Sequence, residues 1–556
     1  MASTAHIDTF AQDRLPPREA WPQFLFNDDT RYPERFNAAV ELVDRHVREG
    51  RGERIAIGYP DAGSAGGFAT VSYAELAALT NRIARVLTED MGLVPGNRIL
   101  LRGPNNLMMA ASLLATLKAG LIAVPTMPLL RARELKQVID RAEVGAALCD
   151  ARLRDELDAN MREGGEFHCP TMRQVLCFNG SGPGSLEAAL EGKPDDFAAC
   201  DTASDDICLI AFTSGTTGQP KGTVHFHRDV LAMCDLFPRH VLKPTADDVF
   251  CGTPPLAFTF GLGGLLCFPL RAGASTVLAE KLTPETLLAL IQDARATIVF
   301  TAPTFYRQMA AAAGRYDLSS LKKSVSAGEA LPDATRQSWK AATGIEMIDG
   351  IGGTEMMHIF ISSAGDEVRP GAIGKVVPGY VARIVDENMQ TLPPGVPGKL
   401  AVQGPTGCRY LDDPRQANYV RDGWNLPGDT FVMDADGYYF YQARSDDMIV
   451  SAGYNIAGPE VEAALMQHEA VAECGVVGAP DDGRGQVVAA YVVLRPGFHG
   501  DDAMRVTLQE HVKRQIAPYK YPRRIHFVDA LPRTETGKLQ RFRLRQMAEQ
   551  NGTPAS

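Results

Sequence analysis

The chain has 556 residues, a net charge of −11, 45% hydrophobic residues and 22% charged residues. This length exceeds one compact hydrophobic core and the composition is that of a globular protein, so we expect at least two domains. The negative net charge argues against nucleic acid as a main partner, because nucleic-acid affinity depends on cationic contacts to phosphate.

Charge is unevenly spread along the chain. Between Lys513 and Arg545 there are ten basic residues and two acidic residues, which gives a local net charge of +8. A solvated helix face would explain part of this excess. A basic patch late in an acidic protein also suits a polyanionic ligand.

The cysteines and the first residues bear on cellular location. Ten cysteines are scattered without a Cys-x-x-Cys pair, a pattern typical of reduced thiols. The N-terminus lacks the basic and apolar regions of a signal peptide. The most apolar stretch, 107–125, is interrupted by Lys118. We therefore expect a cytoplasmic protein without a membrane span.

Helical and extended patterns alternate through the first two thirds of the chain. The early pattern predicts an extended segment at 70–73, a helix at 74–89, a strand at 98–101, a helix at 107–118 and a strand at 121–124. Further candidate strands follow at 274–279, 296–301, 323–326 and 346–348. This alternation predicts an α/β fold with a mostly parallel sheet, which binds ligands at the carboxyl ends of its strands.

A segment rich in glycine and hydroxyl residues follows the apolar run 207–212. It reads Thr213-Ser214-Gly215-Thr216-Thr217-Gly218-Gln219-Pro220-Lys221-Gly222. Glycines let backbone N–H groups approach a polyphosphate, and the hydroxyls and Lys221 add donors, so we interpret the segment as a phosphate loop. A flexible surface loop is the alternative, but the preceding strand and Pro220 favour phosphate. It is not a Walker A loop, because no Gly-Lys pair in the chain is followed by Ser or Thr.

Two later strand ends are also rich in glycine. The strand at 323–326 runs into Ala327-Gly328-Glu329-Ala330, and the one at 345–348 runs into Asp349-Gly350-Ile351-Gly352-Gly353-Thr354-Glu355. Glycine-rich turns let backbone lie flat against a purine, so both are candidates for an adenine site. A Thr-Glu pair alone could cap a helix, but its position behind a glycine-rich strand end favours a ligand.

The last quarter of the chain adds two more candidate regions. Asp429 could accept both hydroxyls of a ribose and Arg444 could hold a hydroxyl or a phosphate, although a surface ion pair is the alternative. Helical and extended patterns then alternate over about 110 residues, which predicts a small α/β domain. Near its end the chain reads Leu531-Pro532-Arg533-Thr534-Glu535-Thr536-Gly537-Lys538-Leu539.

The loop at 213–222 resembles, position for position, the phosphate loop of the adenylate-forming superfamily of acyl-CoA synthetases, peptide-synthetase adenylation domains and luciferases. The segment from Pro532 to Lys538 is similar to the superfamily's C-terminal Pro-x-Thr-x-x-Gly-Lys motif. The resemblance implies an α/β fold. Its large N-terminal domain, 1–445, consists of mostly parallel sheets layered with helices, and its small mobile α/β C-terminal domain, 446–556, hinges at Asp446.

The resemblance also implies which residues handle ATP. Lys538, Thr213 and Glu355 are expected to be catalytic, and Glu355 is also expected to bind Mg²⁺. The full set implied for ATP or AMP is Thr213, Ser214, Gly215, Thr216, Thr217, Gly218, Lys221, Gly328, Glu329, Ala330, Asp349, Gly350, Ile351, Gly352, Thr354, Asp429, Arg444 and Lys538.

Two segments, 254–263 and 352–360, resemble those of benzoate- and 2-aminobenzoate-CoA ligases. This resemblance implies that Phe260, where benzoate ligases tend to have Tyr, walls the acid pocket and that His358 donates to the carboxylate. The implied pocket residues are Phe258, Thr259, Phe260, Gly261, Gly353, His358 and Ile359. The alternative is that Phe260 and Ile359 are ordinary core residues.

These features predict an ATP-dependent ligase that adenylates an aromatic carboxylate and transfers the acyl group to coenzyme A, releasing AMP and pyrophosphate. The implied coenzyme A contacts are Gly453, Tyr454, Lys520, Arg523 and Arg524. The alternatives are a short- or medium-chain fatty acyl-CoA synthetase, an enzyme that loads a carrier protein, and a nucleotide-binding scaffold without catalysis. We expect no nucleic-acid or membrane partner, and a homodimer is compatible with the sequence.

Overall fold

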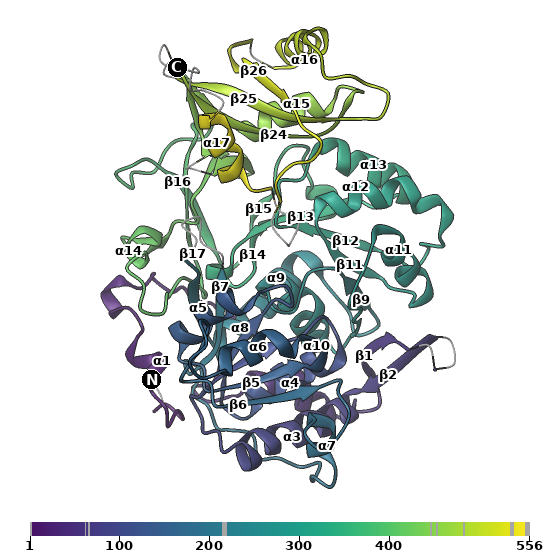
Figure 1. Cartoon of the computed structure of the whole chain (residues 1–556), viewed down its shortest axis with the longest axis vertical. Helices are drawn as coiled ribbons and strands as arrows, with labels where there is room; N and C mark the ends of the chain where they lie inside the picture. The colour runs from purple at the N-terminus through teal and green to yellow at the C-terminus, as the bar shows by residue number, and fades with distance from the viewer. Residues whose placement is uncertain are drawn as a thin grey trace.

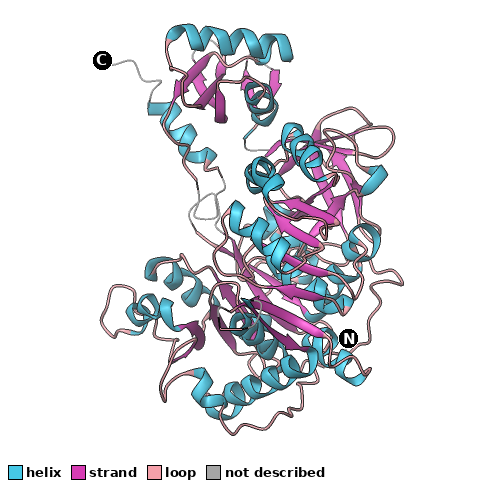
Figure 2. Ribbon diagram, turned by 90° about the vertical axis from the view of Figure 1, so that its right-hand side faces the viewer, coloured by secondary structure: helices cyan, strands magenta, loops and turns pink. Residues whose placement is uncertain are grey.

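The structure is a computed structural model that describes residues 3–61, 63–64, 67–213, 219–444, 447–451, 454–481, 484–516, 518–533 and 539–550. These residues form helices and four β-sheets. Most of the chain builds a large N-terminal part, and the last strands and helices form a smaller unit at one end of it (Figures 1 and 2). The predicted α/β fold with a large and a small part is confirmed.

A six-stranded sheet carries the flanks of the predicted phosphate loop. Its strands run parallel except for the last pair, which is antiparallel. Three of its central strands are buried along their whole length, as expected where helices cover both faces. In spatial order the strands are β6 (Gln174–Phe178), β5 (Ala146–Asp150), β3 (Arg98–Arg102), β4 (Ile122–Thr126), β7 (Ile207–Thr213) and β8 (Lys221–Phe226).

Some helices of this region begin at side-chain caps. The Asn106 side chain accepts a hydrogen bond from the Met109 backbone at the start of α4 (Leu107–Lys118), as predicted for this helix. Ser72 and Glu75 form a capping box, so Tyr73, expected to be extended, is instead the first residue of α3. The helices are α1 (Phe10–Asp13), α2 (Arg45–Arg48), α3 (Tyr73–Arg85), α4, α5 (Ala132–Ala142), α6 (Arg154–Met161), α7 (Leu186–Leu190) and α8 (His227–Asp235).

A nine-stranded sheet carries the predicted adenine and acid segments. It is parallel from β13 to β1 and antiparallel at both edges. In spatial order the strands are β15 (Lys375–Val376), β14 (Ile359–Ser362), β13 (Met347–Gly352), β12 (Lys323–Ala327), β11 (Ile298–Thr301), β9 (Val249–Gly252), β10 (Ser275–Val277), β1 (Ile55–Pro60) and β2 (Phe68–Ser72). The helices around it are α9 (Thr259–Leu262), α10 (Phe268–Ala272), α11 (Pro284–Asp293), α12 (Pro303–Ala312) and α13 (Asp333–Thr343).

Strand β13 is longer than the sequence predicts. The segment from Asp349 to Gly352, expected as part of a turn, lies inside β13, and its last three residues pair antiparallel with β14. A Cβ atom at Gly350 would lie 2.7 Å from the Ile359 side chain, and one at Gly352 would lie 2.5 Å from the His358 carbonyl oxygen. The glycines therefore permit close pairing of the two strands, and the turn begins only at Gly353.

The third sheet of the large part is antiparallel throughout, which the expectation of mostly parallel sheets did not include. Its strands are β18 (Val420–Arg421), β19 (Trp424–Asn425), β17 (Gly398–Gln403), β20 (Asp429–Met433) and β21 (Tyr439–Arg444), with β16 (Val381–Val385) beside β17. The short helix α14 (Gln416–Tyr419) precedes β18. The antiparallel ladder brings Asp429 directly opposite Arg444.

The C-terminal unit has its own sheet and buried apolar clusters. Its elements are β22 (Ile449–Ser451), β23 (Tyr454–Ile456), α15 (Gly458–Met466), β24 (Val471–Asp481), β25 (Gly485–Leu494), α16 (Asp502–Gln515), β26 (Arg524–Phe527) and α17 (Arg541–Gln550). The predicted boundary between Ser445 and Asp446 lies outside the described residues. In the described part of the chain, every helix is too short or too polar to cross a membrane.

Candidate active site

The predicted phosphate loop joins β7 to β8. Thr213 lies opposite Lys221 in the antiparallel pair, so β7 and β8 form a hairpin at the edge of the sheet. Residues Ser214, Gly215, Thr216, Thr217 and Gly218 lie outside the described residues. The Thr213 Oγ1 atom is buried and has no hydrogen-bond partner among the described residues, so it remains available to a ligand.

Lys221, Tyr410 and Glu355 form a hydrogen-bonded network beside this hairpin. The Lys221 ammonium donates to the Tyr410 hydroxyl at 2.8 Å, and that hydroxyl donates to Glu355 Oε1 at 2.6 Å. Lys221 Nζ lies 3.5 Å from Glu355 Oε1 and 4.8 Å from the centre of the Tyr410 ring. The structure thus joins two residues predicted to handle ATP through a tyrosine that the sequence did not single out.

The Glu355 carboxylate is the candidate ligand for Mg²⁺. It is 8% exposed and sits in the 3-10 turn η9 (Thr354–Met356) at the end of β13. The described residues contain no group of three His, Cys, Asp or Glu side chains that could enclose a metal ion. A single carboxylate still fits Mg²⁺, which is commonly held by one or two carboxylates together with substrate phosphates and water.

The predicted adenine segments meet at the carboxyl ends of β12 and β13, which are neighbours in the sheet. Gly328 has a φ of +89°, a conformation that glycine adopts readily, and it is exposed together with Ala330. The half-buried Glu329 carboxylate accepts a hydrogen bond from Thr304 at 2.8 Å. Ile351, between the two strand glycines, is half-buried. These residues therefore present an accessible backbone edge.

Asp349 is the buried acid of this region. Asp349 lies opposite Ser326 in the parallel β12–β13 pair, and its Oδ1 atom is buried without a partner among the described residues. Burial raises the pKa of Asp349 to about 7, because desolvation disfavours the charged form. A carboxyl group with this pKa is about half protonated at neutral pH and can serve as either donor or acceptor.

The predicted ribose pair is brought together by the antiparallel sheet. Arg444 Nη1 lies 3.4 Å from Asp429 Oδ1 and donates to the Pro427 carbonyl oxygen at 2.8 Å. Asp429 is 8% exposed, whereas the Arg444 side chain is 45% exposed. Gly428, at a φ of +83°, leaves room for the guanidinium, since a Cβ there would lie 2.8 Å from Arg444 Nη2.

His358 lies in a cage of aromatic rings. Its ring centre is 4.5 Å from that of Phe268, 5.6 Å from Phe260 and 5.8 Å from Phe237. Burial lowers the pKa of His358 to about 3. Its Nε2 atom is 3.4 Å from the Phe260 carbonyl oxygen, and its Nδ1 atom is buried without a partner among the described residues. The imidazole is therefore neutral and keeps polar capacity for a ligand.

The other predicted acid-pocket residues pack closely around this cage. Phe258 precedes α9, which contains Thr259, Phe260 and Gly261. A Cβ atom at Gly261 would lie 2.1 Å from the Pro255 carbonyl oxygen, so this glycine accommodates backbone rather than open ligand space. Gly353 differs, because a Cβ there would meet Glu355 Oε2 only at 3.5 Å, an ordinary contact distance. Ile359 begins β14 and is buried.

Three of the predicted coenzyme A contacts already have partners within the C-terminal unit. Lys520 Nζ donates to both carboxylate oxygens of Glu460 at 2.6 Å. Arg523 donates to the Tyr521 hydroxyl at 2.8 Å, and Arg524 lies 3.6 Å from Asp481. These three residues are therefore not a free cationic patch in this structure.

Several predicted residues of the C-terminal unit lie outside the described residues or directly next to such a segment. Lys538, Gly453 and Asp446 lie outside the described residues. Tyr454 begins β23. Arg533 and Leu539, on either side of Lys538 in the sequence, form an isolated antiparallel backbone bridge.

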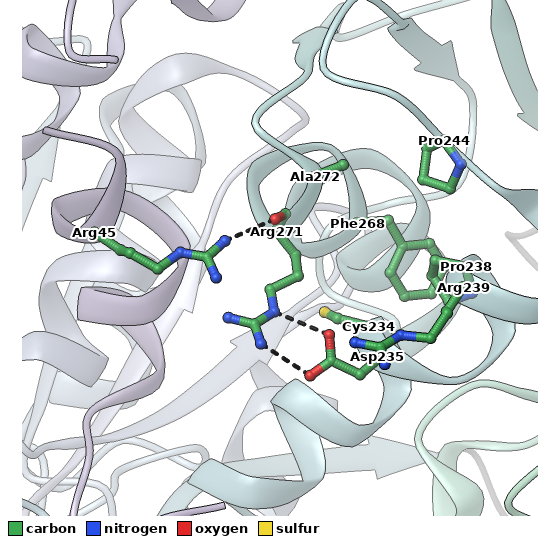
Figure 3. Close-up of a pocket in the computed structure, with 9 residues that line it drawn as sticks. All are labelled: Arg45, Cys234, Asp235, Pro238, Arg239, Pro244, Phe268, Arg271 and Ala272. Atoms are coloured by element: carbon green, nitrogen blue, oxygen red, sulfur yellow. Dashed lines mark hydrogen bonds and ion pairs between the residues drawn. The ribbon is translucent and has the colours of Figure 1, made fainter. Parts of the chain in front are cut away.

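A cavity of about 240 Å³ lies outside the predicted site (Figure 3). It is lined by Arg45, Cys234, Asp235, Pro238, Arg239, Pro244, Phe268, Arg271 and Ala272. Arg271 forms two ion-paired hydrogen bonds with Asp235, at 2.9 and 3.0 Å, and Arg45 donates to the Arg271 carbonyl oxygen. Arg239 pairs with Asp29. The charged side chains that line the cavity are thus already paired within the protein.

Comparison with known proteins identifies the family of this chain. The model of the AMP-binding enzyme family matches residues 43–409, and that of its C-terminal domain matches 460–538. A benzoate-CoA ligase from Thauera aromatica is 37% identical over 92% of this chain and 96% of its own length.

Two solved structures are also similar. An anthranilate-CoA ligase in complex with anthranoyl-AMP aligns with a TM-score of 0.86 and 32% identity over 94% of this chain and 99% of its own. A benzoate-CoA ligase from Burkholderia xenovorans aligns with a TM-score of 0.81 and 31% identity over 92% and 100%. The predicted resemblance to AMP-forming acid–CoA ligases is confirmed, and the chain belongs to the AMP-binding enzyme family.

Proposed function

We propose that this protein is an AMP-forming ligase that activates an aromatic carboxylic acid and transfers it to coenzyme A. The observation that carries the proposal is the change of environment between Glu355 and His358, which lie three positions apart on one segment. Glu355 belongs to a polar network with Lys221, whereas His358 lies among aromatic rings. A flat acid whose ring rests against the aromatic side would direct its carboxylate toward bound ATP.

In the first half-reaction, the carboxylate of the acid attacks the α-phosphorus of ATP and expels pyrophosphate. Thr213, Lys221 and Lys538 would stabilise the negative charge that builds on the phosphates, mainly through their position and field. Glu355 would hold Mg²⁺, which neutralises phosphate charge when bound. No covalent enzyme intermediate is required by this scheme.

The ribose and the adenine of ATP would be bound by the other predicted nucleotide residues. Asp429 and Arg444 would bind the ribose, since a carboxylate can accept from two hydroxyls and a guanidinium can donate to a hydroxyl oxygen. The backbone of Gly328, Glu329 and Ala330 would lie along the adenine. Asp349, with its unpartnered Oδ1 atom, would bind a polar edge of the base.

His358 would recognise the acid as a neutral hydrogen-bond donor. Since its pKa is lowered to about 3, it carries no charge at neutral pH. With its single proton on Nδ1, the atom that has no partner among the described residues, it can orient a carboxylate without forming an ion pair, and the 3.4 Å contact between Nε2 and the Phe260 carbonyl oxygen is then given up as a hydrogen bond. A neutral partner would leave more negative charge on the attacking oxygen than a cation would. Phe260 would form one wall of the slot for the aromatic ring.

In the second half-reaction, the thiol of coenzyme A attacks the acyl carbonyl and AMP leaves. We infer that residues 446–556 reorient against residues 1–445 about Asp446 and that the pantetheine arm passes near Gly453. Polar contacts between the two parts include Arg307 with Glu473 at 3.4 Å, and a half-exposed pair of this kind is weak enough to exchange. Use of Lys520 for a coenzyme A phosphate would require release of Glu460.

The test is the full reaction of the purified protein with MgATP, an acid and a thiol. We expect AMP and an aryl-CoA thioester from benzoate and its 2-amino and hydroxy derivatives, with kcat/KM values above those for hexanoate and octanoate. A preference for the straight-chain acids would support a fatty acyl-CoA synthetase instead. Activity with a carrier-protein thiol but not with free coenzyme A would indicate a loading enzyme.

A further inference from the structure

We propose that Tyr410 is a positioning residue that sets the distance between Lys221 and Glu355 and orients the Glu355 carboxylate toward the metal. The inference rests on the proposed roles of Lys221 and Glu355 in ATP binding. Tyr410 itself would touch neither ATP nor the acid. Its hydroxyl would act through the two charged groups that it joins.

The distances support a spacer role. The two hydrogen bonds through the phenol, at 2.8 and 2.6 Å, are shorter than the direct Lys221–Glu355 separation of 3.5 Å. Without the hydroxyl, the ammonium and the carboxylate would be free to close on each other, because opposite charges attract strongly in a site shielded from water. Each charge would then be less available to phosphate or Mg²⁺.

The orientation of Glu355 supports the same role. Both the hydrogen bond from Tyr410 and the contact with Lys221 fall on Oε1. The opposite oxygen, Oε2, lies toward Gly353, where a Cβ would be 3.5 Å away. A carboxylate fixed through one oxygen presents the other in a defined direction, and such supporting hydrogen bonds tune metal affinity.

The backbone around Tyr410 is held firmly in place. Residues 409–411 extend the edge of the six-stranded sheet, since Val224 donates to the Arg409 carbonyl oxygen and Leu411 donates to that of Gly222. Arg409 also forms a fully buried ion pair with Asp229. The position of the phenol is therefore set by the sheet and not by the network itself.

The hydrogen bonds of the phenol suit a spacer. Its hydroxyl has one proton to donate, which it gives to Glu355, while its oxygen accepts from the Lys221 ammonium.

The test compares Tyr410→Phe with the control Tyr439→Phe, which also removes a buried hydroxyl that donates one hydrogen bond, to the Ala382 carbonyl oxygen at 2.8 Å. Calorimetry of ATP binding with and without Mg²⁺ should show that Tyr410→Phe lowers Mg²⁺ affinity about tenfold, the usual scale for losing a residue that supports a metal ligand. The half-saturating Mg²⁺ concentration for pyrophosphate release should rise similarly. The KM for the acid should not change.

A double-mutant cycle with Glu355→Gln separates positioning from general damage. If Tyr410 acts through Glu355, adding Tyr410→Phe to Glu355→Gln should change Mg²⁺ dependence less than twofold. Equal Mg²⁺ affinity in Tyr410→Phe and wild type would overturn the proposal. Failure of the wild type to release pyrophosphate with any acid would instead contradict the proposed function.

Lys221→Met provides a second route if Tyr410→Phe does not fold. This variant keeps the Tyr410–Glu355 hydrogen bond and removes only the cation. We expect weaker ATP binding with nearly unchanged Mg²⁺ dependence. A comparable loss of Mg²⁺ affinity in Lys221→Met would show that the lysine orders Glu355, and the spacer role of Tyr410 would be wrong.

Discussion

The two ends of the site hold their polar groups in different ways. At the nucleotide end, Lys221, Tyr410 and Glu355 are linked by hydrogen bonds of 2.8 and 2.6 Å. At the acid end, His358 is enclosed by three phenylalanine rings, and its Nδ1 atom has no partner among the described residues. One end is a charged network, and the other is an apolar cage with a single neutral polar group.

This difference indicates which property of a ligand each end can recognise. A charged network responds to phosphate and metal, whose charges must be matched. An apolar cage responds to shape, and its one polar group fixes orientation. A change at one end should therefore affect the apparent KM for one substrate and leave the other substrate's KM nearly unchanged.

Glu355→Gln should have the largest effect, because it removes the charge expected to hold Mg²⁺. Acid-dependent pyrophosphate release should fall by about 10²–10³-fold, the scale of losing one preorganised electrostatic group. Binding of the aryl acid, measured by calorimetry, should be preserved. A variant that loses acid affinity to the same degree would show that the two ends are not independent.

His358→Phe should impair the opposite end. It keeps the ring shape and removes the N–H donor, so the KM for the aryl acid should rise by about 10–100-fold, as expected for a lost hydrogen bond to a charged group. The KM for ATP should stay within twofold of wild type in steady-state kinetics. His358→Gln, which restores a donor, should recover part of the loss. An unchanged acid KM in His358→Phe would exclude the histidine from acid recognition.

Buried titratable groups at the two ends should give opposite pH effects on stability. The pKa of His358 is lowered to about 3, so between pH 6.5 and 3 the unfolded chain binds a proton that the native imidazole does not, and stability falls as pH falls. The pKa of Asp349 is raised to about 7, so stability falls as pH rises from about 4 to 7.

Thermal unfolding between pH 4.5 and 7.5 would separate these two contributions. Relative to wild type, His358→Phe should lose less Tm on acidification, whereas Asp349→Asn should lose less Tm as the pH rises toward 7. Identical pH profiles for wild type and both variants would mean that neither group is buried in the state described.

Phe260→Tyr should produce the smallest effect. The added hydroxyl gives the aromatic wall a donor and acceptor, so the relative kcat/KM for hydroxy- or amino-substituted benzoates over benzoate should change by about tenfold or less, the range of one neutral hydrogen bond. Kinetics with ATP should be unaffected. An equal change for every acid would indicate altered packing and not altered recognition.

Much of the nucleotide end could be predicted because its residues belong to contiguous segments. Lys221 follows the glycine-rich hairpin, Glu355 follows the end of β13, and the α/β alternation fixes both at carboxyl edges of sheets. Asp429 and Arg444 are 15 positions apart, yet one antiparallel ladder places them opposite each other. The positions of these residues can therefore be predicted from the local sequence of the strands and turns that hold them.

Other features depend on tertiary packing that no local pattern encodes. Tyr410 reaches the network because its segment pairs with β8, more than 180 positions earlier in the chain. The neutrality of His358 results from burial among the rings of Phe237, which lies two residues after α8, Phe260 of α9 and Phe268 of α10. The ion pair of Lys520 with Glu460 joins residues 60 positions apart. Tyr410 itself was not singled out in the sequence, whereas for His358 and Lys520 the residue was singled out and only its partners were missing.

The most direct test of the account is a competition for adenylation without coenzyme A. The protein is incubated with MgATP and an equimolar mixture of benzoate, 2-aminobenzoate, hexanoate and octanoate, and the acyl adenylates are quantified by mass spectrometry. The account predicts that aryl adenylates exceed the straight-chain adenylates at least tenfold, about 1.4 kcal/mol of discrimination. A majority of straight-chain adenylates, or no acyl adenylate from any of these acids, would contradict it.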